Sequence, residues 1–171
     1  MDLQKKILQY ISDEAKDLTI THHVFHNALH IENVRKKERT SNPVNLRVLS
    51  KPQYWVNDKK FNPFYVRKHS KAIAHSIYKK ITARTYEPFP VAVNKIAKPS
   101  GGFREVSIYQ IPDAAISKLF YHRLLAKNKH RFSSFSYAYR DDRNVHFAIQ
   151  DISVELSQSS RVFVAEFDFS K

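Results

Sequence analysis

The chain has 171 residues, of which 42% are hydrophobic and 13% aromatic, and it contains 29 Lys and Arg against 16 Asp and Glu. This composition excludes a disordered chain, the absence of cysteine excludes disulfides and a thiolate zinc site, and no run of about 18 apolar residues is present that could span a membrane. The formal net charge of +13 indicates a polyanionic partner, nucleic acid before membrane, because the basic residues are spread along the chain.

The N-terminal residues have the pattern of an amphipathic helix. Leu3, Ile7 and Ile11 recur at helical spacing, which predicts a helix over residues 2–16. Asp2 stands where an N-cap is expected. The start of the chain has no apolar signal-peptide core, which fits a cytoplasmic protein.

A second, weaker helical pattern covers residues 21–39, residues 40–43 have the composition of a linker, and residues 44–61 predict no clear element. Asn62 followed by Pro63 is typical of a helix start, with a cap and then proline in the first helical position. The apolar face expected for that helix consists of Val66, Ile73, Ile77 and Ile81.

Two extended runs, residues 91–98 and 103–111, flank the only two glycines of the chain, Gly101 and Gly102. Adjacent glycines between extended runs predict a β-hairpin whose tip needs positive φ angles. The hairpin is the most regular β pattern in the sequence.

A hairpin that is symmetric about Gly101 would place Lys98 and Arg104 directly opposite each other, on one face with Ile96 and Val106 beneath them. Two cations beside a glycine-rich tip could bind a triphosphate, the lysine through its compact charge and the arginine through two parallel hydrogen bonds from its planar guanidinium group. The alternative interpretation is a pair of solvated charges on a surface hairpin.

Pro112 and Asp113 open a further predicted helix, whose apolar face is Ile116, Leu119, Phe120 and Leu124. A loop rich in Ser, Tyr and Arg follows over residues 130–143. Asn144 is a plausible cap for another helix. The residues expected on its buried side are Val145, Ala148, Ile149, Ile152 and Leu156.

The loop interleaves aromatic residues, among them Tyr137, with Arg140 and Arg143. Aromatic rings could stack on bases and arginines could bind phosphates. In the alternative interpretation the aromatic rings pack on the core and the arginines pair with Asp141 and Asp142.

The closing run, residues 161–168, is apolar and β-branched, which predicts a buried strand that ends at Asp168. A carboxylate at such a position suits Mg²⁺, which takes hard oxygen ligands. It could equally serve as a helix cap or an ion-pair partner.

His22, His26 and His30 fall on one helical face, with His23 beside them. Two of them could bind zinc, but no carboxylate or cysteine completes an obvious site. Surface histidines near nucleic acid are the preferred interpretation.

Along the chain stand, in order, Lys-Pro-x-Gly-Gly-x-Arg, Ile-Pro-Asp, Phe-x-x-x-Ser-Tyr-x-x-Arg, an apolar helix and a strand ending in Phe-Asp-Phe-Ser-Lys. Over about residues 86–171 this order resembles the fingers and first palm strand of reverse transcriptases, most closely the bacterial group of group II intron, retron and phage-defence enzymes. The Phe-Asp-Phe-Ser strand is most similar to the defence enzymes.

The resemblance implies roles for individual residues. Lys98 and Arg104 would belong to the fingertip that closes over the triphosphate of the incoming nucleotide. Asp168 would be the first metal-binding aspartate, with the backbone carbonyl of Phe169 as the neighbouring ligand. The residues that would lie along the template and nucleotide pocket are Tyr137, Arg140 and Arg143.

The sequence departs from the family in two respects. It has Ala138-Tyr139-Arg140 where family members often have Gly-Phe-Arg, and downstream of Asp168 it contains no Tyr-x-Asp-Asp motif, sugar gate, primer grip or thumb. Because the complete enzyme uses two Mg²⁺ ions held by further carboxylates, Asp168 alone cannot hold the pair. We therefore expect the chain to be a fragment that is inactive by itself.

The fold expected from the resemblance is α+β, an incomplete right-hand polymerase. Residues 1–62 would form a helical extension, residues 63–160 the fingers with their hairpin, and residues 161–171 the first strand of the palm sheet. The implied partners are an RNA template, a DNA primer or product, deoxynucleoside triphosphates and a possible non-coding RNA, with no membrane.

Two other functions stay open at this point. The chain could be a non-catalytic nucleic-acid-binding module derived from a polymerase and kept for its basic surface. It could also be one half of a split enzyme that a second polypeptide completes. An unpaired, strongly apolar closing strand would make the isolated chain prone to aggregation.

Overall fold

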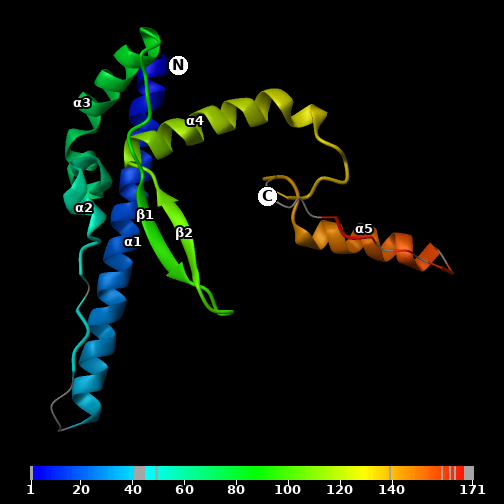
Figure 1. Cartoon of the computed structure of the whole chain (residues 1–171), viewed down its shortest axis with the longest axis horizontal. Coiled ribbons are helices and arrows are strands. Elements are labelled where there is room, and N and C mark those ends of the chain that lie inside the picture. Colours follow the sequence, from blue (N-terminus) through cyan, green and yellow to red (C-terminus); the bar gives the residue numbers. More distant parts are fainter. Residues whose placement is uncertain are drawn as a thin grey trace. The chain divides into compact units, whose positions relative to one another are not determined.

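A computed structural model describes residues 2–40, 45–48, 50–138, 140–158, 160–161, 163 and 165–167 of the chain (Figure 1). The chain divides into two units, Met1–Leu124 and Leu125–Lys171. Within the described residues the structure is mostly helical, with one two-stranded antiparallel sheet, and this confirms the predicted α+β class.

Helix α1, Leu3–Arg39, is continuous where the sequence pattern predicted two separate helices. Asp2 caps it as predicted, since its carboxylate accepts a hydrogen bond from the Gln4 N–H at 3.4 Å. No glycine or proline interrupts residues 17–20, and the Thr19 hydroxyl donates to the Ala15 carbonyl at 2.7 Å within the helix. The weaker apolar pattern after residue 16 therefore does not mark a helix end.

Helix α3, Pro63–Thr82, begins at the predicted residue. The Asn62 side chain accepts from the Phe64 N–H at 3.0 Å, which confirms the cap. Before it, the segment that the sequence left unassigned forms the short helix α2, Tyr54–Asn57, and the 3₁₀ turn η1, Lys59–Phe61. Figure 1 shows α3 running beside the first half of α1.

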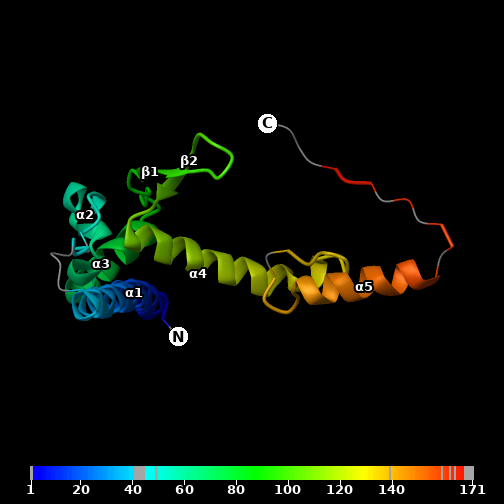
Figure 2. The ribbon, with the colours of Figure 1, turned by 90° about the horizontal axis from the view of Figure 1, so that it is seen from below.

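The core of the first unit lies between α1, α3 and the start of α4, Ile111–Asn128. In Figure 2, α1 is seen end-on with α3 against it and the start of α4 beside both. Fully buried isoleucines such as Ile7 and Ile11 each contribute roughly 1.5–3 kcal/mol to folding, so this contact fixes the helices. The buried core residues are Ile7, Ile11, Ala15, Val66, Ala74, Ile77, Ile111, Ala115, Ile116 and Leu119.

Only part of the predicted apolar face of α4 is buried. Ile116 and Leu119 belong to the core, whereas Phe120 is 44% exposed and Leu124 is 61% exposed. The apolar face continues past the core at these last two residues, because the packing against α1 and α3 covers only the beginning of the helix.

Strands β1, Ala92–Ala97, and β2, Phe103–Ile108, form the predicted hairpin. Its tip is a three-residue loop: the Gly101 N–H donates to the Lys98 carbonyl at 3.1 Å, and the Lys98 N–H donates to the Gly102 carbonyl at 3.0 Å. Gly101 and Gly102 have φ angles of 87° and 79°, which accounts for glycine at both positions. A β-turn followed by a glycine with positive φ is a common hairpin closure.

The predicted symmetry about Gly101 was wrong. Ile96 is the residue that pairs with Arg104, so the hairpin is centred on Ser100 and Lys98 is not directly opposite Arg104. The reason is that Pro99 takes the first central position of a β-turn over residues 98–101, which suits its preset φ angle. This places the centre of the hairpin one residue earlier than predicted.

The second unit contains the 3₁₀ turn η2, Lys129–Arg131, and helix α5, Val145–Gln158. Asn144 caps α5 as predicted, accepting from the His146 N–H at 2.9 Å. The side of α5 that was predicted to be buried is exposed, with Ile149 and Ile152 each 58% exposed. Periodicity identifies an apolar face, but burial requires a second surface that covers it.

The described residues of the closing segment, among them Phe163 and residues 165–167, are not part of a strand. Phe163 is 97% exposed and Phe167 is 91% exposed. A strand requires a partner for its backbone groups. The prediction of a buried strand is therefore wrong for the described residues of this run, while the palm strand of a complete enzyme stays a prediction. The last residues of the run, including Asp168 and Phe169, lie outside the described residues.

Candidate functional site

The hairpin tip carries two exposed cations. Lys98 follows Ile96 by two residues and Arg104 is paired with Ile96, so the alternation of the strands places both cations on the same face, in diagonal positions. In both views the tip lies away from the helices of this unit (Figures 1 and 2). The shared face that the sequence predicted is thus present, although the direct opposition is not.

The two faces of the hairpin differ in how their charges are paired. On the other face, the Lys95 ammonium lies 3.6 Å from the Glu105 carboxylate. Among the described residues, neither Lys98 nor Arg104 has a carboxylate within ion-pair distance. The tip therefore presents positive charge that the fold does not neutralise, which suits a polyanionic ligand.

A buried carboxylate ties both ends of the hairpin together. Asp113, in the first turn of α4, is 5% exposed and accepts a hydrogen bond from the Phe89 N–H at 2.9 Å. Its other oxygen accepts from the Tyr86 hydroxyl. Because Phe89 precedes β1 and Asp113 follows β2, this contact holds the base of the hairpin against the core.

The environment of Tyr86 is unusual for a tyrosine. Burial, and then the hydrogen bond to Asp113, raise the pKa of Tyr86 well above its usual range. From sequence, Asp113 was predicted as part of a helix start and of the Ile-Pro-Asp motif, and its contact with the hairpin was not predicted. The available signal was an acidic residue within an otherwise apolar first helical turn.

In the second unit, Arg140 is engaged within its own loop. Its Nε and Nη2 atoms donate to the two oxygens of Asp142 at 3.0 and 2.8 Å. Its Nη1 donates to the backbone carbonyls of Ser133 and Ser136 at 3.2 and 3.4 Å. Hydrogen bonding from Arg140 lowers the pKa of Asp142 below its usual range. For this arginine the alternative interpretation, pairing with a loop aspartate, is confirmed.

Tyr137 and Arg143 are engaged in the same unit. The Tyr137 hydroxyl donates to the Asp151 carboxylate, and this hydrogen bond raises the pKa of Tyr137. Arg143 donates to the Ser134 carbonyl, and its guanidinium carbon lies 5.5 Å from the centre of the Tyr137 ring. The residues assigned to the template pocket thus organise their own loop, and contact with nucleic acid stays a prediction for them.

The structure supports no metal centre within the residues it describes. It shows no group of three or more His, Asp or Glu side chains there that could hold a metal ion. Two histidines of α1 contact aromatic rings: the ring of His22 lies 5.2 Å from that of Trp55 and that of His23 lies 5.7 Å from that of Phe64. In the part of the chain that is described, no helix is long and apolar enough to cross a membrane.

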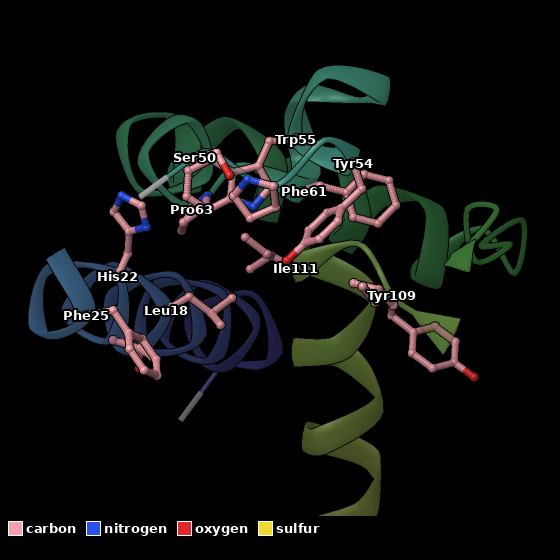
Figure 3. A pocket seen from close by; sticks show the side chains of 13 residues that line it. Leu18, His22, Phe25, Ser50, Tyr54, Trp55, Phe61, Pro63, Tyr109 and Ile111 are labelled. Carbon is pink, nitrogen blue, oxygen red and sulfur yellow. The ribbon is translucent and has the colours of Figure 1, made fainter. Parts of the chain in front are cut away.

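An apolar pocket of about 330 Å³ lies between α1, α2 and the start of α4. Figure 3 shows Leu18, His22 and Phe25 of α1 on one side of it and Tyr54 and Trp55 on the other. The sequence analysis missed this pocket because it assigned no element to residues 44–61. The density of aromatic residues around Trp55 was the available signal.

Comparison with known proteins gives no assignment. No protein-family model matches this chain, and no curated protein sequence matches it. Function is therefore argued from the residues and their geometry.

Proposed function

We propose that the chain is the N-terminal part, with the fingers, of an RNA-directed DNA polymerase of the bacterial reverse transcriptase type. The observation that carries the proposal is the hairpin tip, where Lys98 and Arg104 share a face and have no carboxylate partner among the described residues. The motif order along the sequence supports the same function.

The chemistry of the tip fits a triphosphate. Lysine supplies a compact charge and arginine a planar fork, and together they would neutralise the charge that develops as pyrophosphate leaves. The buried contact of Asp113 with Phe89 supports this role, since a hairpin with an anchored base can hold its tip cations in place.

Magnesium belongs to the proposed complete enzyme, with Asp168 as one ligand and the Phe169 carbonyl as another. The ligand types suit the ion, but one carboxylate does not complete a two-metal site. The further carboxylates would have to come from a Tyr-x-Asp-Asp motif downstream of Asp168, and the one such string in this sequence, residues 139–142, precedes Asp168. We therefore derive no catalytic step for the chain itself.

A second candidate function is that of a non-catalytic nucleic-acid-binding module. It is favoured by the net charge of +13 together with the internal engagement of Arg140 and Tyr137, which leaves the hairpin as the polyanion-binding feature. Both candidate functions predict nucleic-acid binding. They differ in whether the protein needs Asp168 for its function: the polymerase does, and the binding module does not.

The deciding experiment uses the complete coding product that contains this chain, assayed for Mg²⁺-dependent nucleotide incorporation on primed RNA. We expect incorporation that Asp168→Ala abolishes, and no incorporation by the 171-residue chain alone. Incorporation by the isolated chain would contradict the inactive-fragment prediction. Absence of activity in the complete product, with RNA binding retained in Asp168→Ala, would favour the binding module.

A further inference from the structure

A second pocket of the first unit, with a volume of about 240 Å³, lies between α3 and the segment that precedes β1. It shares no residue with the hairpin or the closing segment. The lining residues that matter chemically are Lys60, Tyr65, His69, Ser76, Lys80 and Phe89.

Two ammonium groups converge on one aromatic ring at this pocket. The Lys60 Nζ lies 3.3 Å from the centre of the Phe89 ring, and the Lys80 Nζ lies 5.4 Å from it. Lys60 comes from η1 and Lys80 from the last turn of α3. The Phe89 backbone N–H donates to the buried Asp113, which holds the segment that carries this ring.

The positive charge of the pocket is not balanced by the protein. Among the described residues, neither Lys60 nor Lys80 has a carboxylate within ion-pair distance. Asp113 does not line the pocket, and its oxygens already accept from Tyr86 and Phe89. Glu87 is exposed and does not line it either. Two like charges held at one ring repel each other, and a bound anion would remove that repulsion.

The remaining wall is aromatic and carries hydrogen-bonding groups. The rings of Tyr65 and His69 lie 4.4 Å apart with an angle of 34° between their planes, so they pack against each other in the wall of the pocket. Ser76 adds a hydroxyl beside it. Cations next to aromatic rings are the combination that recognises a phosphate attached to a base.

We propose that this pocket binds the phosphate of a nucleotide through Lys60 and Lys80, with the base against Tyr65 and His69. The nucleotide could be free or part of a single-stranded RNA, because both present the same chemistry. The proposal does not depend on polymerase activity, since none of its residues belongs to the hairpin tip or the closing segment.

The first test measures binding of a short fluorescein-labelled oligouridine by fluorescence anisotropy. Lys60→Gln/Lys80→Gln is compared with Lys79→Gln, which removes a neighbouring exposed charge of α3 outside the pocket. We expect the double variant to bind roughly tenfold more weakly and its slope of log K against log salt to fall by about 0.7, as loss of one phosphate contact to a single strand requires. Equal affinity of the double variant and Lys79→Gln would overturn the proposal.

The second test keeps the unmodified chain and so does not depend on the folding of variants. Lysine acetylation is followed by mass spectrometry with adenosine monophosphate, with oligouridine, or without ligand. Protection of Lys60 and Lys80 but not Lys79 by the mononucleotide identifies a free nucleotide as the ligand. The same protection by RNA only identifies a nucleotide within a strand, and protection by neither rejects the site. Arg104→Ala should keep the protection, which separates this site from the proposed fingertip.

Discussion

Among single residues, Asp113 connects the hairpin to the core most directly. Its two oxygens accept from the Tyr86 hydroxyl and the Phe89 N–H in a buried position. Removal of the carboxylate would leave two donors without a partner in a site that excludes water. The loss of such a partner costs more than the hydrogen bond itself contributes.

We predict that Asp113→Ala lowers the free energy of unfolding by about 2 kcal/mol or more, because each unsatisfied buried donor costs about 1–3 kcal/mol. Urea denaturation followed by circular dichroism measures this change. Glu87→Ala, at an exposed position of the same segment, is the control and should be nearly neutral. Equal stability of the two variants would show that the Asp113 contacts do not support the fold.

The same contact predicts a pH dependence. Because folding raises the pKa of Tyr86, the stabilisation is fully present below the ordinary tyrosine pKa of about 10 and is lost as the pH rises past that value. The free energy of unfolding should therefore decrease as the pH rises above about 10, up to the raised pKa of Tyr86 in the folded protein. Tyr86→Phe should show a smaller decrease, and an identical decrease in both proteins would argue against this coupling.

The tip cations give a prediction for the complete enzyme. Arg104→Ala should raise the KM for nucleotide or lower turnover by roughly tenfold or more, since a charge-assisted hydrogen bond contributes about 1.5–3 kcal/mol. Lys95→Ala is the matched control, because Lys95 lies on the other face and pairs with Glu105. Unchanged steady-state and single-turnover kinetics in Arg104→Ala would reject the triphosphate role.

At the scale of elements, the hairpin shows how local chemistry sets geometry. Pro99 begins the turn, and Gly101 and Gly102 adopt positive φ angles that other residues rarely take. No atom lies within 4 Å of a Cβ added to either glycine. A substitution there is therefore strained by conformation alone and not by a clash.

We predict that Gly101→Ala destabilises the hairpin by about 1 kcal/mol, the usual cost of a left-handed conformation with a side chain. The expected result is roughly fivefold faster hydrogen exchange of the β1 and β2 amides, with the exchange of α1 and α3 unchanged. Ser100→Ala, in the same loop, should leave the rates as they are. If Gly101→Ala also left them unchanged, the tip conformation would not be the one described.

At the scale of the whole molecule, the two units differ in how well their apolar surfaces are covered. The first unit buries isoleucines of α1, α3 and α4 in one core. In the second unit, apolar residues of α5 remain exposed. These are Val145, Phe147, Ile149, Ile152, Val154 and Leu156. An exposed apolar face of this kind is a surface for association.

We therefore predict that the isolated chain self-associates as its concentration rises. Size-exclusion chromatography with light scattering should show a smaller mass for Ile149→Ser/Ile152→Ser than for the unmodified chain. Val24→Ser, which removes a single exposed apolar side chain from α1, is the control and should behave like the unmodified chain. A monomer at every concentration would contradict the prediction.

The candidate site divides into parts that could be predicted from sequence and parts that could not. The glycine pair located the hairpin, and alternation placed Lys98 and Arg104 on one face. The pairing of Arg140 with Asp142 was one of two alternatives that composition left equal. The convergence of Lys60 and Lys80 on Phe89 could not be predicted, because it depends on how the segment that precedes β1 packs against α3.

The sequence by itself determined the helix starts and the hairpin, because these depend on neighbouring residues. Asp2, Asn62 and Asn144 each cap their own helix through a backbone N–H two residues further on. Only the tertiary structure decided which apolar faces are buried and which charges are paired. Ile116 of α4 enters the core while Ile149 of α5 stays exposed, since burial depends on a partner surface that periodicity does not specify.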